Sequence, residues 1–427
     1  MPNDKVSQPC GAEAGVFWKR CCLAVLLLTA VRVEAIDQTG DIDMRWKVFT
    51  RQKQEQLEKL AEREHLAVPT EAREFFRAVE ADDQVAVSNR FATLKGLTNI
   101  LFVPIQETMG AYEQFHAWDG AMLRKFAEGI LQSIPDGSIY FGGTDPGRFV
   151  ITAVRDVEQS PKILILTPKF VITQNALINT SYLDYLPSTY GDRLWVPAVT
   201  NIEAAVQQYV AELQKREERG ETLGLDEKLV KDKDGHPHVK GVAGAMNING
   251  IVTKMIFDNN KARHDFYVEE SYVIPWMYPY LEPHGLILKL NKESLANLDP
   301  AVVARDKQYW GALTKELVAD PRFLQNERAR KTFSKLRSAI GGLYSYRHMT
   351  NDAEAAFMEA LELCPTSPEA VFRTAQLYME SDRFDDAAAV FQRFHDNPRL
   401  SDNEKQRIGE AIAQVRNLQR QHNNQPK

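Results

Sequence analysis

The feature of this sequence that most constrains its fold is a repeat near the C-terminus, in which small and aromatic residues recur every 34 residues. Gly341 recurs as Ala375, and Tyr344 recurs as Tyr378. The three other pairs are Ala353 with Ala387, Phe357 with Phe391, and Ala360 with Phe394. Small residues let two helices approach closely, and aromatic residues fill the groove between neighbouring helices. The spacing predicts two helical hairpins within residues 334–398.

The order of these residues matches the tetratricopeptide pattern. Ser367 precedes a proline and begins a helix in the favoured way. A capping box from Ser401 to Glu404 predicts a final helix, up to about residue 419, that caps the repeats. Modules of this type bind other proteins on the surface of the stacked helices, so we expect a protein partner. The alternative is that these helices only support the domain before them.

The charge of the chain argues against nucleic acid as a partner. The 427 residues carry a formal net charge of −6, and acidic and basic residues are interspersed. A nucleic-acid-binding protein concentrates Lys and Arg on one face to meet the phosphates. We therefore expect a protein without nucleic-acid contacts, long enough for two or three domains.

The N-terminus has the features of an export signal. Lys19 and Arg20 precede an apolar run over residues 21–31, which is too short to span a bilayer. Residues 33–35, Val-Glu-Ala, resemble a cleavage site between small residues. We predict a signal peptide over residues 1–35 and an exported protein, periplasmic or extracellular. An uncleaved anchor and a misassigned start codon are the alternatives.

Cleavage at that site has two consequences for the mature chain. Cys364 would be its one cysteine, so no disulfide could form within it and its stability must come from its core. No apolar run of about 18 or more residues follows the signal segment, so we expect no membrane span in the mature chain.

The apolar pattern divides the rest of the chain into three regions. Residues 44–134 follow helical periodicity. Residues 135–295 mix short buried strands with helices, which predicts an α/β domain with an open, mainly parallel sheet. Residues 299–420 are helical again and contain the repeats. The expected strands cover residues 138–141, 163–166, 170–175, 193–196, 266–268 and 286–290, with a hairpin turn at residues 231–236.

A glycine-rich segment after the first predicted strand is the best candidate for a ligand site. It contains Gly142, Gly143, Thr144, Asp145 and Arg148. Glycines let main-chain amides approach an anion, Arg148 could add positive charge, and Asp145 could meet a metal ion or a sugar hydroxyl. The segment matches neither the phosphate-binding loop nor the dinucleotide-binding fingerprint. A tight turn from strand to helix is the alternative.

Two amide residues, Gln174 and Asn175, follow another predicted strand. Ligands bind open α/β sheets at the edge formed by the carboxyl ends of the strands. We therefore expect both residues at the same edge as the glycine-rich segment. The alternative for Asn175 is to cap the next helix.

Other candidates for catalysis or metal binding are weaker. Glu269 and Glu270 could form an acid–base pair, but adjacent residues of a strand face opposite sides, so we expect a solvated edge there. His236 and His238 are a weak metal cue, and residues 231–234 lack the rest of a calcium loop. The sequence has no nucleophile elbow. We assign no catalytic residue, no metal and no cofactor.

Three segments, as an ordered set, resemble the soluble extracytoplasmic region of large bacterial proteins of the protein O-mannosyltransferase-like clan. The segments are residues 138–148 (SIYFGGTDPGR), residues 173–186 with TQNAL and YLDYL, and residues 279–286 (PYLEPHGL). The similarity covers about residues 118–398, and in some members of the clan tetratricopeptide repeats follow. It implies an accessory domain connected with glycan handling.

The same resemblance argues against glycosyl transfer by this chain. In that clan, catalysis is expected from an acidic residue between membrane helices, and this sequence has no such helices. The leading hypothesis is therefore an exported, non-catalytic scaffold whose repeats bind a protein of the cell envelope. The rival is a sugar- or nucleotide-binding enzyme that uses Gly142 to Arg148 with Gln174 and Asn175.

Overall fold

The computed structural model describes residues 42–158, 168–221, 223, 227–231, 235, 237–270, 273–398 and 400–423. Three predictions fall outside these residues: the signal peptide over residues 1–35, the strand at residues 163–166, and the tip of the hairpin at residues 232–234 with His236. Within the described residues, every helix is too short or too polar to cross a membrane. The described residues from Trp46 onward form one compact unit.

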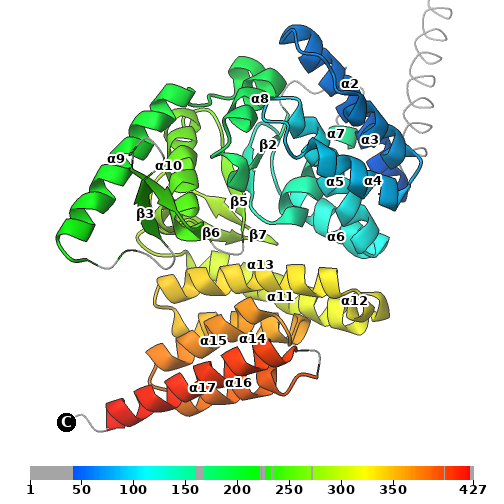
Figure 1. Cartoon of the computed structure of the whole chain (residues 1–427). Coiled ribbons are helices and arrows are strands. Elements are labelled where there is room, and N and C mark those ends of the chain that lie inside the picture. Colours follow the sequence, from blue (N-terminus) through cyan, green and yellow to red (C-terminus); the bar gives the residue numbers. More distant parts are fainter. Residues whose placement is uncertain are drawn as a thin grey trace, which may run out of the picture. The chain divides into compact units, whose positions relative to one another are not determined.

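The described residues are mostly helical and carry one mixed sheet of five strands (Figure 1). The order of its strands is β2-β1-β5-β7-β6. β1 is parallel to β2 and β5, whereas β7 is antiparallel to β5 and β6. The strands are β1 (Ile139–Gly142), β2 (Phe170–Thr173), β5 (Phe266–Glu269), β6 (Leu281–His284) and β7 (Ile287–Leu290).

The predicted α/β sheet is therefore correct in part, because only half of it is parallel. The antiparallel half arises from the β6–β7 hairpin. Gly285 follows β6 with a φ of 58°, a conformation that glycine adopts without strain. This turn pairs His284 with Ile287 and adds two antiparallel strands to the parallel ones.

Residues 193–196 do not form the strand that the sequence predicts. A short 3-10 turn, Gly191–Arg193, is followed by irregular chain up to α9 (Val199–Glu218). The main-chain groups of Trp195 bond to a side chain instead of a neighbouring strand. Its N–H donates to Asn260 Oδ1 at 3.0 Å, and its carbonyl accepts from Asn260 Nδ2 at 2.9 Å. Asn260 thus satisfies the polar groups that a strand partner would have met.

Helices and a small hairpin surround the sheet (Figure 1). The N-terminal helices are α2 (Ile42–Arg63), α3 (Thr70–Glu80), α4 (Gln84–Leu94), α5 (Phe102–Ala117) and α6 (Gly120–Leu131). Those inserted between strands are α7 (Ile151–Glu158), α8 (Thr180–Tyr190), α9 and α10 (Val242–Asn260). Strands β3 (Lys228–Lys231) and β4 (Pro237–Lys240) form the predicted hairpin on α9 and α10.

A buried charged network joins the N-terminal helices to the sheet region. Lys53 on α2 lies 2.6 Å from Glu107 on α5 and 3.0 Å from Asp156 on α7. It also donates to the hydroxyl of Tyr185 on α8 at 3.0 Å. Burial lowers the pKa of Lys53, but the two carboxylates outweigh that effect and raise its pKa well above the ordinary value. The network therefore fixes four helices around one cation.

The C-terminal helices form a stack that begins at α11 (Figure 1). Asp299 caps α11 by accepting from the amide of Ala301, and Ser401 forms the predicted capping box with Glu404. The helices are α11 (Pro300–Ala319), α12 (Pro321–Gln325), α13 (Glu327–Tyr346), α14 (Thr350–Leu363), α15 (Pro368–Glu380), α16 (Phe384–His395) and α17 (Asp402–Asn423).

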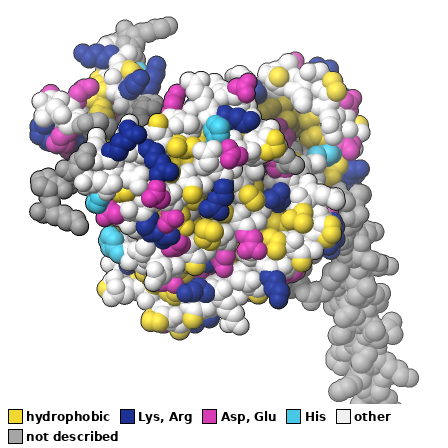
Figure 2. All heavy atoms as spheres, turned by 90° about the horizontal axis from the view of Figure 1, so that it is seen from below, with side chains coloured by type: hydrophobic (Ala, Val, Ile, Leu, Met, Phe, Trp, Pro, Cys, Tyr) yellow, Lys and Arg dark blue, Asp and Glu magenta, His cyan; other side chains and the backbone are white. Residues whose placement is uncertain are grey.

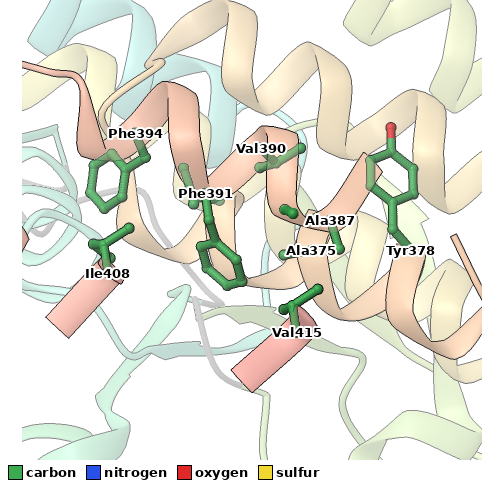
Figure 3. Packing of buried hydrophobic residues seen from close by; sticks show 10 residues of the cluster. Ala375, Tyr378, Ala387, Val390, Phe391, Phe394, Ile408 and Val415 are labelled. Atoms are coloured by element: carbon green, nitrogen blue, oxygen red, sulfur yellow. The ribbon is translucent and has the colours of Figure 1, made fainter. Parts of the chain in front are cut away.

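The small and aromatic residues singled out by their spacing lie inside this stack. Gly341 on α13 is so close to α14 that an added Cβ would lie 2.6 Å from the ring of Phe357. In the following helices, the predicted residues pack with Ile408 and Val415 of α17 (Figure 3). These predicted positions are Ala375, Tyr378, Ala387, Phe391 and Phe394, all buried.

One end of α13 is held against the sheet region. The Tyr346 ring stacks on Tyr278 with centroids 4.8 Å apart. Arg347, just after α13, donates to the carbonyls of Leu295 at 2.5 Å and Pro279 at 2.8 Å. The first helix of the first predicted repeat therefore packs on the preceding domain.

We expect Gly341→Ala to destabilise the chain although alanine favours a helix. Its Cβ would overlap the Phe357 ring, and overpacking of this kind costs about 1–3 kcal/mol. Gly311→Ala on α11 is the matched control, because its Cβ would meet no atom within 4 Å. It should stabilise the chain by about 0.5–1 kcal/mol. Urea unfolding measures both changes, and an equal gain for the two variants would contradict the packing argument.

Candidate functional site

The carboxyl ends of β1, β2 and β5 bring the predicted site residues to one edge of the sheet. Parallel strands end at the same edge, so the segments that follow them are neighbours. The 142–148 loop follows β1, and Gln174 and Asn175 follow β2. Glu269 is the last residue of β5, and Glu270 comes directly after it. The first two groups were expected here from the sequence.

The 142–148 loop is fixed by hydrogen bonds from both neighbouring strands and from within. The hydroxyl of Tyr140 on β1 donates to the carbonyl of Gly147 at 3.0 Å. The side chain of Asn175 donates to the carbonyl of Gly143 at 2.7 Å. The amide of Gly147 donates to the Thr144 hydroxyl at 3.1 Å. The chain then enters a π-helical turn, Pro146–Val150, that continues into α7.

The donors of the loop converge on a carboxylate of the chain itself. Glu269 Oε2 accepts from the amide of Thr144 at 3.1 Å and from that of Gly143 at 3.3 Å. Glu269 Oε1 accepts from the Thr144 hydroxyl at 2.6 Å. Glu269 thus occupies the position that an external anion would take on these amides.

The glycines of the loop are needed because the carboxylates lie against the main chain. A Cβ at Gly147 would be 1.6 Å from Glu269 Oε2, and one at Gly143 would be 1.8 Å from Glu270 Oε2. Any side chain at either position would displace a carboxylate. The sequence signal that we read as room for a ligand therefore also marks the place of Glu269 and Glu270.

The prediction of a solvated edge for Glu269 and Glu270 is wrong. Glu269 is 0% exposed and Glu270 is 8% exposed, and both carboxylates reach the 142–148 loop. The alternation rule fails because β5 ends at Glu269, so Glu270 is free of the strand geometry. Burial first, and then repulsion by Glu270, raises the pKa of Glu269 to about 7, against the opposing effect of the bonds from Thr144 and Gly143.

The other predicted site residues surround this pair. Gln174 Nε2 donates to Glu270 Oε2 at 3.3 Å, while Gln174 Oε1 is buried without a partner. Asp145 is exposed and accepts from Arg148 at 2.7 Å. The Arg148 guanidinium also lies over the Phe149 ring, 4.3 Å from its centroid. Of the predicted site residues, Asn175 and Asp145 are the ones with exposed polar groups at this edge.

A separate cleft of about 740 Å³ lies between the β6–β7 hairpin, α6 and α11. Leu286 and Leu313 contribute apolar surface to it, and Lys125, Arg305 and Glu316 contribute charge. Lys125 and Glu316 pair at 2.6 Å. Because charges of both signs line the cleft, it favours no single class of ligand. Among the described residues, no three His, Cys, Asp or Glu side chains are grouped to hold a metal ion.

Comparisons with models of known protein families, with curated proteins and with solved structures find no match for this chain. The resemblance to the protein O-mannosyltransferase-like clan therefore stays a prediction.

The raised pKa of Glu269 predicts a pH-dependent stability. The folded chain holds a proton on Glu269 up to about pH 7, whereas the unfolded chain releases it near the ordinary value of 4.5. Stability from this group is therefore complete below about pH 4.5 and is lost as pH rises to 7, by about 3 kcal/mol.

Glu269→Gln mimics the protonated acid and should remove that loss. We expect the variant to be more stable than the original chain at pH 8, with a difference that shrinks toward pH 5. Glu293→Gln is the control, because Glu293 is a surface carboxylate 87% exposed. Thermal unfolding between pH 5 and 8 tests the prediction, and parallel curves for the original chain and Glu269→Gln would refute it.

Proposed function

We propose that this chain is an exported, non-catalytic scaffold of the cell envelope that binds a protein partner through two tetratricopeptide-type repeats at its C-terminus. The observation that carries the proposal is the packing of α13 to α17. Glycine and alanine lie where helices approach closely, and Phe357 and Phe391 fill the spaces between helices. A connection of this scaffold with glycan handling is suggested by the family resemblance alone.

The 142–148 loop supports the non-catalytic part of the proposal. Its amides at Gly143 and Thr144 could hold a phosphate-bearing substrate, but they donate to Glu269. A phosphate would have to displace a buried carboxylate and would lie beside Glu270. The displacement of Glu269 and the nearby carboxyl group of Glu270 disfavour a nucleotide at this edge.

The docking face that we propose is on α15. In the first repeat, the helix that corresponds to α15 is α13. The segment around Tyr278 and Pro279 covers part of it, because Tyr278 stacks on Tyr346 and Arg347 donates to the carbonyl of Pro279. On α15, Phe372 is 46% exposed, and Gln376 and Glu380 lie one and two turns further along the same side. Figure 2 views the molecule from below Figure 1, where hydrophobic side chains lie in small groups among charged ones. On α15, an exposed aromatic ring in line with two polar side chains suits a reversible protein contact.

The docking face is tested with the full chain as bait in an envelope extract. Phe372→Glu should lose the partner that the original chain retains, because a charge replaces the apolar centre of the face. Leu324→Glu is the matched control, since Leu324 is 48% exposed on α12, outside the repeats. Quantitative mass spectrometry compares the captured proteins, after circular dichroism has shown that both variants fold. The same proteins captured by Phe372→Glu would overturn the assignment of α15.

A second candidate function is the binding of a small polar ligand, such as a sugar, by the edge of the sheet. The observation that favours it is Gln174 Oε1, a buried acceptor without a partner beside Glu270. Asn175 and Asp145 offer exposed polar groups at the same edge.

Thermal-shift measurements with mono- and oligosaccharides and with nucleotides test this candidate. A neutral sugar that binds should raise the melting temperature by linkage, and nucleotides should not. Asp145→Ala should abolish the shift while keeping the melting temperature of the free protein, because Asp145 is exposed. No shift with any sugar at millimolar concentration would leave the scaffold as the supported function.

A further inference from the structure

We infer that Glu269 and Glu270 form a proton-operated latch that holds the 142–148 loop on the sheet. The loop is closed while the pair keeps a proton, and it loosens when both carboxylates are ionised. The physiological setting of this latch rests on the proposed export of the chain, whereas the latch itself does not.

The geometry of the latch is a convergence of two buried carboxylates on one loop. Glu269 accepts three hydrogen bonds from Gly143 and Thr144, and Glu270 lies against Gly143. Thr144 connects the latch to the helix that follows, since its hydroxyl accepts from the amide of Gly147. Movement of the Glu269 carboxyl group would therefore loosen the turn, which Tyr140 and Asn175 also hold.

A proton on Glu269 is compatible with these contacts. A protonated Glu269 can donate to the Thr144 hydroxyl oxygen, 2.6 Å away, while its other oxygen keeps the two amides. Without that proton, Glu269 and Glu270 carry like charges in a region shielded from water, where repulsion is strong. The hydrogen bonds from the loop only partly offset it.

The charged and titratable groups around the latch set the direction of the effect. Glu270 on the strand extension and Tyr140 on β1 interact electrostatically with Glu269, and burial keeps Tyr140 neutral by raising its pKa well above the ordinary value. On the loop, Asp145 and Arg148 pair with each other. With the pKa of Glu269 raised to about 7, ionisation of Glu269 occurs as pH rises through neutrality.

The latch would expose one defined set of groups when it opens. The side-chain amide of Asn175 donates to the carbonyl of Gly143. When the loop loosens, this side-chain amide becomes free at the edge of the sheet. Outside the cytoplasm a protein meets the pH of the surroundings, so a group that titrates near pH 7 can report it. Opening of the latch would thereby change the surface around Asn175 while the rest of the chain stays folded.

Hydrogen–deuterium exchange of the purified full chain tests the latch. Exchange of the peptide that spans the loop is measured at pH 6 and pH 8 and corrected for the chemical exchange rate. We expect its protection to fall about tenfold in the original chain and to stay constant in Glu269→Gln. Glu293→Gln is the surface control and should behave like the original chain.

Glu270→Gln is the second variant, because it removes the repulsion and leaves the bonds of Glu269 in place. It too should keep the loop protected at pH 8. Constant protection in the original chain, or an equal fall in both Gln variants, would overturn the proposal. The measurement needs no partner protein, so failure of the latch and failure of the docking proposal are separate outcomes.

Discussion

A buried carboxylate must be met by donors, because an ion away from water is costly unless it is paired and hydrogen-bonded. Glu107 on α5 meets Lys53 on α2, and Asp306 on α11 meets Arg337 on α13 at 2.8 Å. Glu269 on β5 meets the loop that follows β1. In each case the donor comes from another segment. These contacts therefore tie together segments that lie far apart in the sequence.

The contacts at the end of α13 bear on two readings of the C-terminal helices. Taken alone, the repeat suggested either an independent binding arm or a support for the preceding domain. The contacts of Tyr346 and Arg347 make α13 part of the wall of that domain. The face of α15 around Phe372 remains open to solvent. The inner helix therefore supports the preceding domain, and the outer helix leaves Phe372 exposed.

The sequence predicted where the candidate site lies but not what occupies it. The 142–148 loop and Gln174 each follow a buried strand, and strand direction alone brings them to one edge. The burial of Glu269 was not predicted, because it depends on donors more than 120 residues away in the chain, which periodicity cannot detect. The missing strand around Trp195 has a similar cause, since Asn260 takes its polar groups. Local sequence patterns cannot predict hydrogen bonds between a side chain and main-chain groups that lie far away in the sequence.

The pairing of β1 with β5 also sets the order in which the chain can fold. Ile139 lies beside Phe266, yet most of the sheet region separates them in the sequence. Such a contact loses much chain entropy before it contributes stability, so sheets of this topology close slowly. One side of β1 stays unpaired until β5 has been synthesised. Until then, Ile139 and Phe141 lack the strand that lies beside them in the folded sheet.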